Sequence, residues 1–157
     1  MKSHSRYAKK LNRKLVLICL ILFFALLPVF SYLHEAGHGL VCTADGNEAE
    51  ISVNFSGGTT LCHGDVSNQF AYKISGGLLA GIIGITVGIA LFRWKIPFIA
   101  LTTIGAGHLV NAVIETFANS YFTRGGDWSA ILAFIEFVTF LSLMIIFDRK
   151  MVKQNVR

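Results

Sequence analysis

Residues 15–38 of the chain read LVLICLILFFALLPVFSYLHEAGH, an apolar run that ends in two histidines and a glutamate. Its first part, residues 15–33, is nineteen residues long and carries no charge. Because a helix rises about 1.5 Å per residue, such a run comes close to the roughly 30 Å of a bilayer core. The pattern therefore predicts a membrane helix, from about Leu15 to about Cys42, with its polar groups near one end.

Three further stretches are apolar and long enough to cross a membrane. Residues 74–92 and 96–114 contain no Asp, Glu, Lys or Arg, and residues 128–147 contain only Glu136. Over the whole chain 54% of the residues are apolar and 15% are charged, a composition typical of membrane proteins. We therefore predict an all-α membrane protein in which residues 15–147 form one domain of four transmembrane helices.

The basic residues indicate how these helices are oriented. Twelve of the fourteen lysines and arginines lie in the N-terminal tail 1–14, the loop 93–95 and the C-terminal tail 148–157. With four spans, these segments share one side of the membrane, which the positive-inside rule makes cytoplasmic. We expect a multi-pass cell-membrane protein with both termini in the cytoplasm. The net charge of +5 then reflects contact with the lipid bilayer and not nucleic-acid binding.

Residues 44–70 form the largest segment outside the predicted spans. Apolar and polar side chains alternate over residues 51–55, which predicts a strand, and the turn residues 56–58 lead into a partner strand over 59–63. An isolated hairpin is marginal in water, so it must rest on the membrane helices. We therefore predict a small extracytoplasmic β-hairpin.

Three cysteines are present. Cys19 lies inside the first predicted span, where it serves as a small apolar residue. Cys42 and Cys62 both belong to the outer side, where oxidising conditions permit a disulfide between them. Two free thiols are the alternative, and sequence spacing does not decide between the two.

The motif that carries chemistry is His34-Glu35-Ala36-Gly37-His38, an HExxH sequence. Two histidines four apart project from one face of a helix and can hold one metal ion. Glu35 is then placed to accept a proton from the water that attacks a peptide bond. Ionisable groups in a membrane helix are costly and usually functional. We interpret the motif as a site for one zinc ion per chain, with Glu35 as catalytic base; a polar cluster without metal is the alternative.

A catalytic zinc ion usually has three protein ligands and one open position. We predict Asp127 as the third ligand, because it precedes the fourth span and so emerges on the side where the first helix ends. An aspartate at that place also caps a helix well, which is the structural alternative. Glu115 and Glu136 are the rival ligands, since both are acids within predicted membrane helices.

A polar stripe marks the third predicted helix, where His108, Asn111 and Glu115 follow at separations of three and four. Asn111 is a candidate donor to a substrate carbonyl or oxyanion. His108, Glu115 and Glu136 are candidates for outer-shell groups that orient a zinc-binding histidine. Hydrogen bonding between helices, without a chemical role, explains the stripe equally well.

The HExxH motif inside a membrane helix resembles the site-2 protease family of intramembrane zinc metalloproteases, peptidase family M50. Residues 73–77, KISGG, are similar to the glycine-containing start of the family's middle helix, and residues 48–63 match its short β-structure. Asp127 corresponds by order and placement to the family's ligand aspartate. The family's Asn-Pro-x-x-Asp-Gly reads YFTRGGDW here over residues 121–128, without the proline or the glycine after the aspartate.

This resemblance implies a zinc metalloendopeptidase that cuts membrane-anchored or membrane-proximal proteins, so the expected partners are membrane protein or peptide substrates. One alternative is a zinc-binding membrane sensor or assembly factor without proteolytic activity. A transporter is the other, although four short spans without a visible repeat disfavour it.

Overall fold

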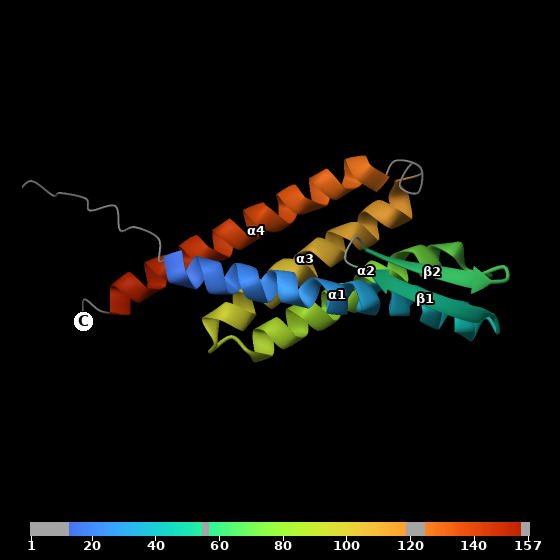
Figure 1. Ribbon diagram of the computed structural model, residues 1–157, viewed down its shortest axis with the longest axis horizontal. Helices are drawn as coiled ribbons and strands as arrows, with labels where there is room; N and C mark the ends of the chain where they lie inside the picture. The colour runs from blue at the N-terminus through green and yellow to red at the C-terminus, as the bar shows by residue number, and fades with distance from the viewer. Residues whose placement is uncertain (1–12, 55–56, 119–124, 155–157) are drawn as a thin grey trace, which may run out of the picture.

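The computed structural model describes residues 13–54, 57–118 and 125–154, with the side chains of 125–129 and 148–154 left aside. The described chain is mostly helical and carries one antiparallel β-hairpin. Its elements are, in order, α1 (Arg13–Ala44), β1 (Glu48–Asn54), β2 (Gly57–His63), α2 (Gln69–Ala90), α3 (Lys95–Phe117) and α4 (Gly125–Gln154). The helices run along one long axis, and the hairpin lies at one end (Figure 1).

All four helices are long and apolar enough to cross a membrane. The mean hydropathy of their most apolar stretches ranges from 1.5 in α3 to 2.7 in α1. α3 is also the most buried of the four, because α1, α2 and α4 all pack against it. A helix shielded by its neighbours can carry polar groups that a lipid-facing helix cannot.

All four helices differ from the predicted runs at their ends: α2 begins at Gln69 and ends at Ala90, and α3 runs from Lys95 to Phe117. α1 begins at Arg13 and ends at Ala44, and α4 continues to Gln154 through much of the predicted tail 148–157. The added residues of α4 read DRKMVKQ, with neither glycine nor proline to stop a helix. The predicted basic tail before α1 lies, apart from its last two residues, outside the described residues.

Glycines bring α2 directly onto α3. Gly77, Gly81, Gly84 and Gly88 lie on one face of α2, as their spacing predicts. A Cβ atom added at Gly84 would come within 2.8 Å of the Cα atom of Gly105 on α3. This close approach places the polar residues of α3 near the HExxH motif of α1.

Two apolar clusters hold the helices together. One joins α1, α3 and α4 through Cys19, Ile99, Phe140, Met144 and Phe147. The other joins α1, α2 and α3 through Phe30, Ala80, Leu101 and Ile104. Cys19 is fully buried and a free thiol, which agrees with its predicted packing role.

The hairpin rests on one stripe of α1. Glu35, Gly39 and Cys42 form this stripe, at separations of four and three that place them on a common helix face. A Cβ atom at Gly39 would come within 3.2 Å of Ile51 on β1. Cys42 forms a disulfide with Cys62 on β2, which is one of the two alternatives that the sequence left open.

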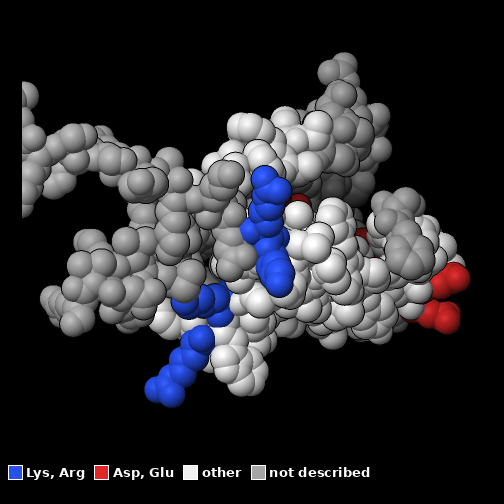
Figure 2. All heavy atoms as spheres, turned by 60° about the vertical axis from the view of Figure 1, so that its left-hand side comes forward, with Lys and Arg blue, Asp and Glu red and all other residues white. Residues whose placement is uncertain are grey.

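The exposed charged side chains are separated along the long axis of the molecule, whereas Lys73 of α2 is half-buried. Exposed acids lie at the hairpin end: Asp45, Glu48, Glu50 and Asp65. Arg13 and Lys14 start α1 at the other end, where the loop between α2 and α3 carries Arg93. Figure 2 shows the exposed acids at one edge of this face and the lysines and arginines away from them.

Candidate metal centre

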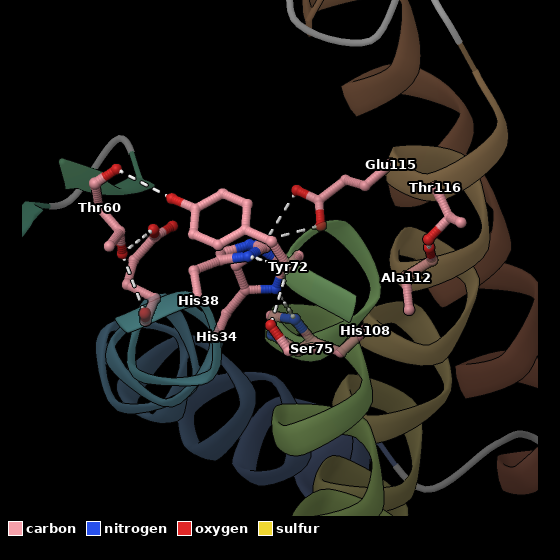
Figure 3. A network of polar contacts seen from close by, with 10 residues as sticks. His34, His38, Thr60, Tyr72, Ser75, His108, Ala112, Glu115 and Thr116 are labelled. Atoms are coloured by element: carbon pink, nitrogen blue, oxygen red, sulfur yellow. Dashed lines mark hydrogen bonds and ion pairs between the residues drawn. The ribbon is translucent and has the colours of Figure 1, made fainter. Parts of the chain in front are cut away.

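Three buried side chains converge where α1 meets α3: His34, His38 and Glu115. The Nε2 atoms of the two histidines are 3.2 Å apart. Oε1 of Glu115 lies 3.2 Å from Nε2 of His34, and its Oε2 lies 3.6 Å from Nε2 of His38. Figure 3 shows these side chains pointing toward one another from their two helices. We refer to the three as the His–His–Glu cluster.

A backbone carbonyl decides which nitrogen His38 presents to this cluster. Nδ1 of His38 lies 2.6 Å from the carbonyl oxygen of Tyr72 on α2. Because a carbonyl oxygen can only accept, Nδ1 must carry the proton and donate it. The unprotonated Nε2 then directs its lone pair into the cluster, as in histidines that bind metals.

His34 has an equivalent partner on α3. Its Nδ1 lies 3.3 Å from Nδ1 of His108. The His108 ring stacks at 26° on that of Phe30, with the ring centroids 6.0 Å apart. If His34 donates from Nδ1 to His108, its Nε2 also directs a lone pair into the cluster. His108, one of the candidates named from the sequence, therefore contacts His34.

The donor set fits a divalent metal ion. Ligand atoms about 2.0–2.1 Å from a tetrahedral zinc ion lie about 3.3–3.4 Å from one another. The two Nε2 atoms are 3.2 Å apart, and one ligand atom from each of the three residues lies within 4.8 Å of the others, so small side-chain adjustments would bring all three to this spacing. Oε2 of Glu115 is buried and has no hydrogen-bond partner among the described residues, so its lone pairs are available. Three protein ligands also leave one coordination position open, as at catalytic sites.

Glu35 lies beside the cluster but on a different face of α1, toward the hairpin. Oγ1 of Thr60 on β2 lies 2.7 Å from Oε2 of Glu35 and 2.9 Å from its backbone oxygen. Gly58 of the same strand packs against the glutamate, since a Cβ atom there would come within 3.1 Å of its Cδ. β2 therefore fixes the Glu35 side chain from the side opposite the helices.

A cavity of about 490 Å³ joins these groups. The cluster, Glu35, His108 and Asn111 line it together with Tyr72 and residues 57–60 of β2. The hydroxyl of Tyr72 lies 3.5 Å from the carbonyl oxygen of Thr60, so α2 contacts the hairpin beside the cavity. One water-accessible space is thus shared by candidate ligands, a candidate base and hydrogen-bond donors.

Two glycines make room for the site. A Cβ atom at Gly76 on α2 would come within 2.7 Å of Cδ2 of His38 and 2.8 Å of the backbone oxygen of His34. A Cβ atom at Gly37 would come within 2.8 Å of the Cα atom of Gly76. Glycine inside the HExxH motif thus allows α1 and α2 to approach closely.

The acid that reaches both histidines, among the described residues, is Glu115, which the sequence left as a rival ligand. Asp127, the predicted third ligand, lies in the first turn of α4, and its side chain is outside the described residues. Glu136 lines a different cavity and packs against Gly107. One sequence signal points to Glu115: it follows His108 and Asn111 by seven and four residues, so the three share one face of α3.

Thr60 and Tyr72 are the site residues that the sequence analysis missed. A usable signal for Thr60 was the disulfide, because Thr60 and Cys62 share one face of their strand while Glu35 and Cys42 share one face of α1.

No protein-family model, curated protein or solved structure matches this chain.

Proposed function

We propose that this protein is an intramembrane zinc metalloprotease that hydrolyses peptide bonds of membrane-anchored or membrane-proximal proteins. The observation that carries the proposal is the position of Glu35, which lines the same cavity as the His–His–Glu cluster without belonging to it. A buried acid outside a complete ligand set is available for proton transfer. A zinc ion held by the cluster would supply Lewis acidity to polarise a peptide carbonyl and activate water.

The side chains of the protein would carry out the proton transfer and stabilise the negative charge that develops on the substrate. Glu35 accepts a proton from the attacking water and later passes it to the leaving amine. Because Thr60 binds Oε2 of Glu35, the other carboxylate oxygen is the one that receives the proton. Asn111 and Tyr72 line the cavity and can donate hydrogen bonds to the substrate carbonyl as it gains negative charge.

We further propose that the four helices cross the membrane with the hairpin end outside the cytoplasm. The arginines and lysine at the opposite end support this orientation. The Cys42–Cys62 disulfide supports it as well, since disulfides persist on oxidising sides of membranes. A substrate helix must unwind to expose its carbonyls, and the backbone of residues 57–60 can pair with the extended segment at the cavity.

The test compares the full-length wild type with Glu35→Gln in detergent, using unfolded β-casein as the reporter substrate. Both should contain one zinc ion per chain, and the variant should cleave at least about a hundredfold more slowly. Glu50→Gln, on the exposed face of β1, is the matched control and should change neither quantity.

The outcomes separate the alternatives. Zinc in both proteins without cleavage by either would favour a zinc-binding sensor or assembly factor. Equal cleavage by both proteins would remove Glu35 as the base. A wild type that binds no metal would overturn the site itself.

A further inference from the structure

A second cavity, of about 370 Å³, lies between α1 and α4 with α3 as its floor. Its walls are largely apolar and include Phe23 and Phe24 of α1 and Phe137 and Phe140 of α4. None of the residues that form it belongs to the His–His–Glu cluster or to the cavity around Glu35. Two polar side chains interrupt this lining: Glu136 of α4 and Thr103 of α3.

Glu136 is an acid within the apolar span of α4. The span covers Ala130–Phe147, and Glu136 is its only charged residue. Its side chain packs against α3 at Gly107, where an added Cβ atom would overlap the carboxyl group. No ion pair joins it to another described residue. An unpaired acid at such a depth is costly, and membrane proteins keep one where it has a partner.

Thr103 lines the same cavity, and its hydroxyl differs from other helix hydroxyls in its hydrogen bonding. Its side chain is 1% exposed, and Oγ1 has no hydrogen-bond partner among the described residues. Hydroxyls elsewhere in the helices donate to the carbonyl four residues earlier, as Thr116 and Thr139 do at 2.6 and 2.8 Å. Thr103 and Gly107 lie four apart on one face of α3, so the hydroxyl and the Glu136 carboxyl share one wall.

The helices of this chain offer Glu136 no cation. Residues 15–72, 74–92, 96–123 and 125–148 contain no lysine or arginine, so neither these segments nor the same segments of a second copy place one at this depth. Lipid headgroups hold their charges at the membrane surface. Large exposed side chains flank the cavity, with Phe24 63% and Phe137 58% exposed, and they offer an apolar face to a helix.

We propose that the cavity between α1 and α4 binds a transmembrane helix of another protein through a lysine or arginine near the middle of that helix. The cation pairs with the carboxylate of Glu136 and donates a hydrogen bond to Oγ1 of Thr103. The aromatic side chains of α1 and α4 pack against the rest of the helix. This interaction is independent of the proposed proteolysis, because it uses none of the residues assigned to that chemistry.

The experiment measures energy transfer between the full-length protein and model helices in uncharged phosphatidylcholine vesicles. One peptide is a polyleucine span with a single central lysine, and its control has leucine at that position. The lysine peptide should bind the wild type about five- to twentyfold more tightly than the leucine peptide. Glu136→Gln, which keeps the side-chain size, should abolish this preference.

Two further variants separate the polar contact from general packing. Thr103→Val should reduce the preference by a few-fold, whereas Thr139→Val, on α4 and already bonded to its own helix, should leave it unchanged. Helical content by circular dichroism serves as the check that each variant is folded. Equal binding of the two peptides by the wild type overturns the proposal without any variant. A preference that survives in folded Glu136→Gln overturns the role of the acid.

Discussion

Oγ1 of Thr60 lies 2.7 Å from Oε2 of Glu35, although the two residues are 25 positions apart and belong to a strand and a helix. The contact makes the hairpin a wall of the candidate active site and not merely an appendage of the helices. Two residues further along β2, the Cys42–Cys62 disulfide ties the same strand to the same stripe of α1. The orientation of the proposed base therefore depends on the hairpin.

Removal of the Thr60 hydroxyl should impair proteolysis without affecting metal binding. A hydrogen bond to a charged group contributes about 1.5–3 kcal/mol, so Thr60→Val should lower kcat by about ten- to a hundredfold. Thr60→Ser, which keeps the hydroxyl, should restore most of the rate. Steady-state kinetics and zinc content measured on the same samples check this. Ser52→Ala is the matched control, because it also removes a hydroxyl but Ser52 is exposed on β1 and lies outside the cavity. A Thr60→Val enzyme with wild-type kcat would show that Glu35 needs no such support.

Replacement of Glu115 should release the metal. Glu115→Ala removes one of three ligands, so the loss of zinc affinity should exceed the roughly 10–100-fold effect of losing an outer-shell partner. Asp127→Ala should retain zinc if Glu115 completes the site. Competition with a chromogenic chelator measures both affinities. Zinc retained by Glu115→Ala but lost by Asp127→Ala would assign the third ligand to Asp127.

A methyl group at Gly76 should distort the metal site from α2. The added Cβ would lie within 2.7 Å of Cδ2 of His38 and 2.8 Å of the backbone oxygen of His34, and a backbone atom cannot easily move away. We expect Gly76→Ala to lose most of its zinc affinity while it stays helical by circular dichroism. Gly81→Ala is the comparison, because its closest contacts are to the flexible side chain of Leu109. Equal zinc affinities for the two variants would contradict this role of Gly76.

Loss of the disulfide should loosen the hairpin and lower activity while zinc stays bound. The bond closes a loop between residues 20 positions apart, which in the chain-entropy model contributes about 3 kcal/mol. We expect Cys42→Ser/Cys62→Ser to show faster amide exchange in β2 and slower cleavage. A phosphine reductant, which lacks the zinc-chelating thiols of a dithiol, should reproduce both effects in the wild type and change nothing further in the double variant. Unchanged exchange in β2 would mean that packing alone holds the hairpin.

Local patterns in the sequence were enough to predict the elements of this fold. Four uncharged or nearly uncharged runs correspond to α1, α2, α3 and α4, because hydropathy and length are properties of a continuous segment. The alternating residues of the hairpin and the two histidines of HExxH could be interpreted in the same way, because the strand and helix periodicities are visible within a few residues. The element ends differed by a few residues where nothing in the sequence stops a helix.

The completion of the site depends on how the helices pack, and this cannot be read from any one segment. Glu115 is 81 positions from His34, and it arrives beside the histidine because the glycines of α2 allow α3 to come close. Thr60 reaches Glu35 because the hairpin folds back onto α1. Chain order and membrane side were the criteria that favoured Asp127. These two criteria determine only the end of the bundle at which a residue lies. Which acid faces two histidines is set by helix rotation and separation, and both come from contacts between residues far apart in sequence.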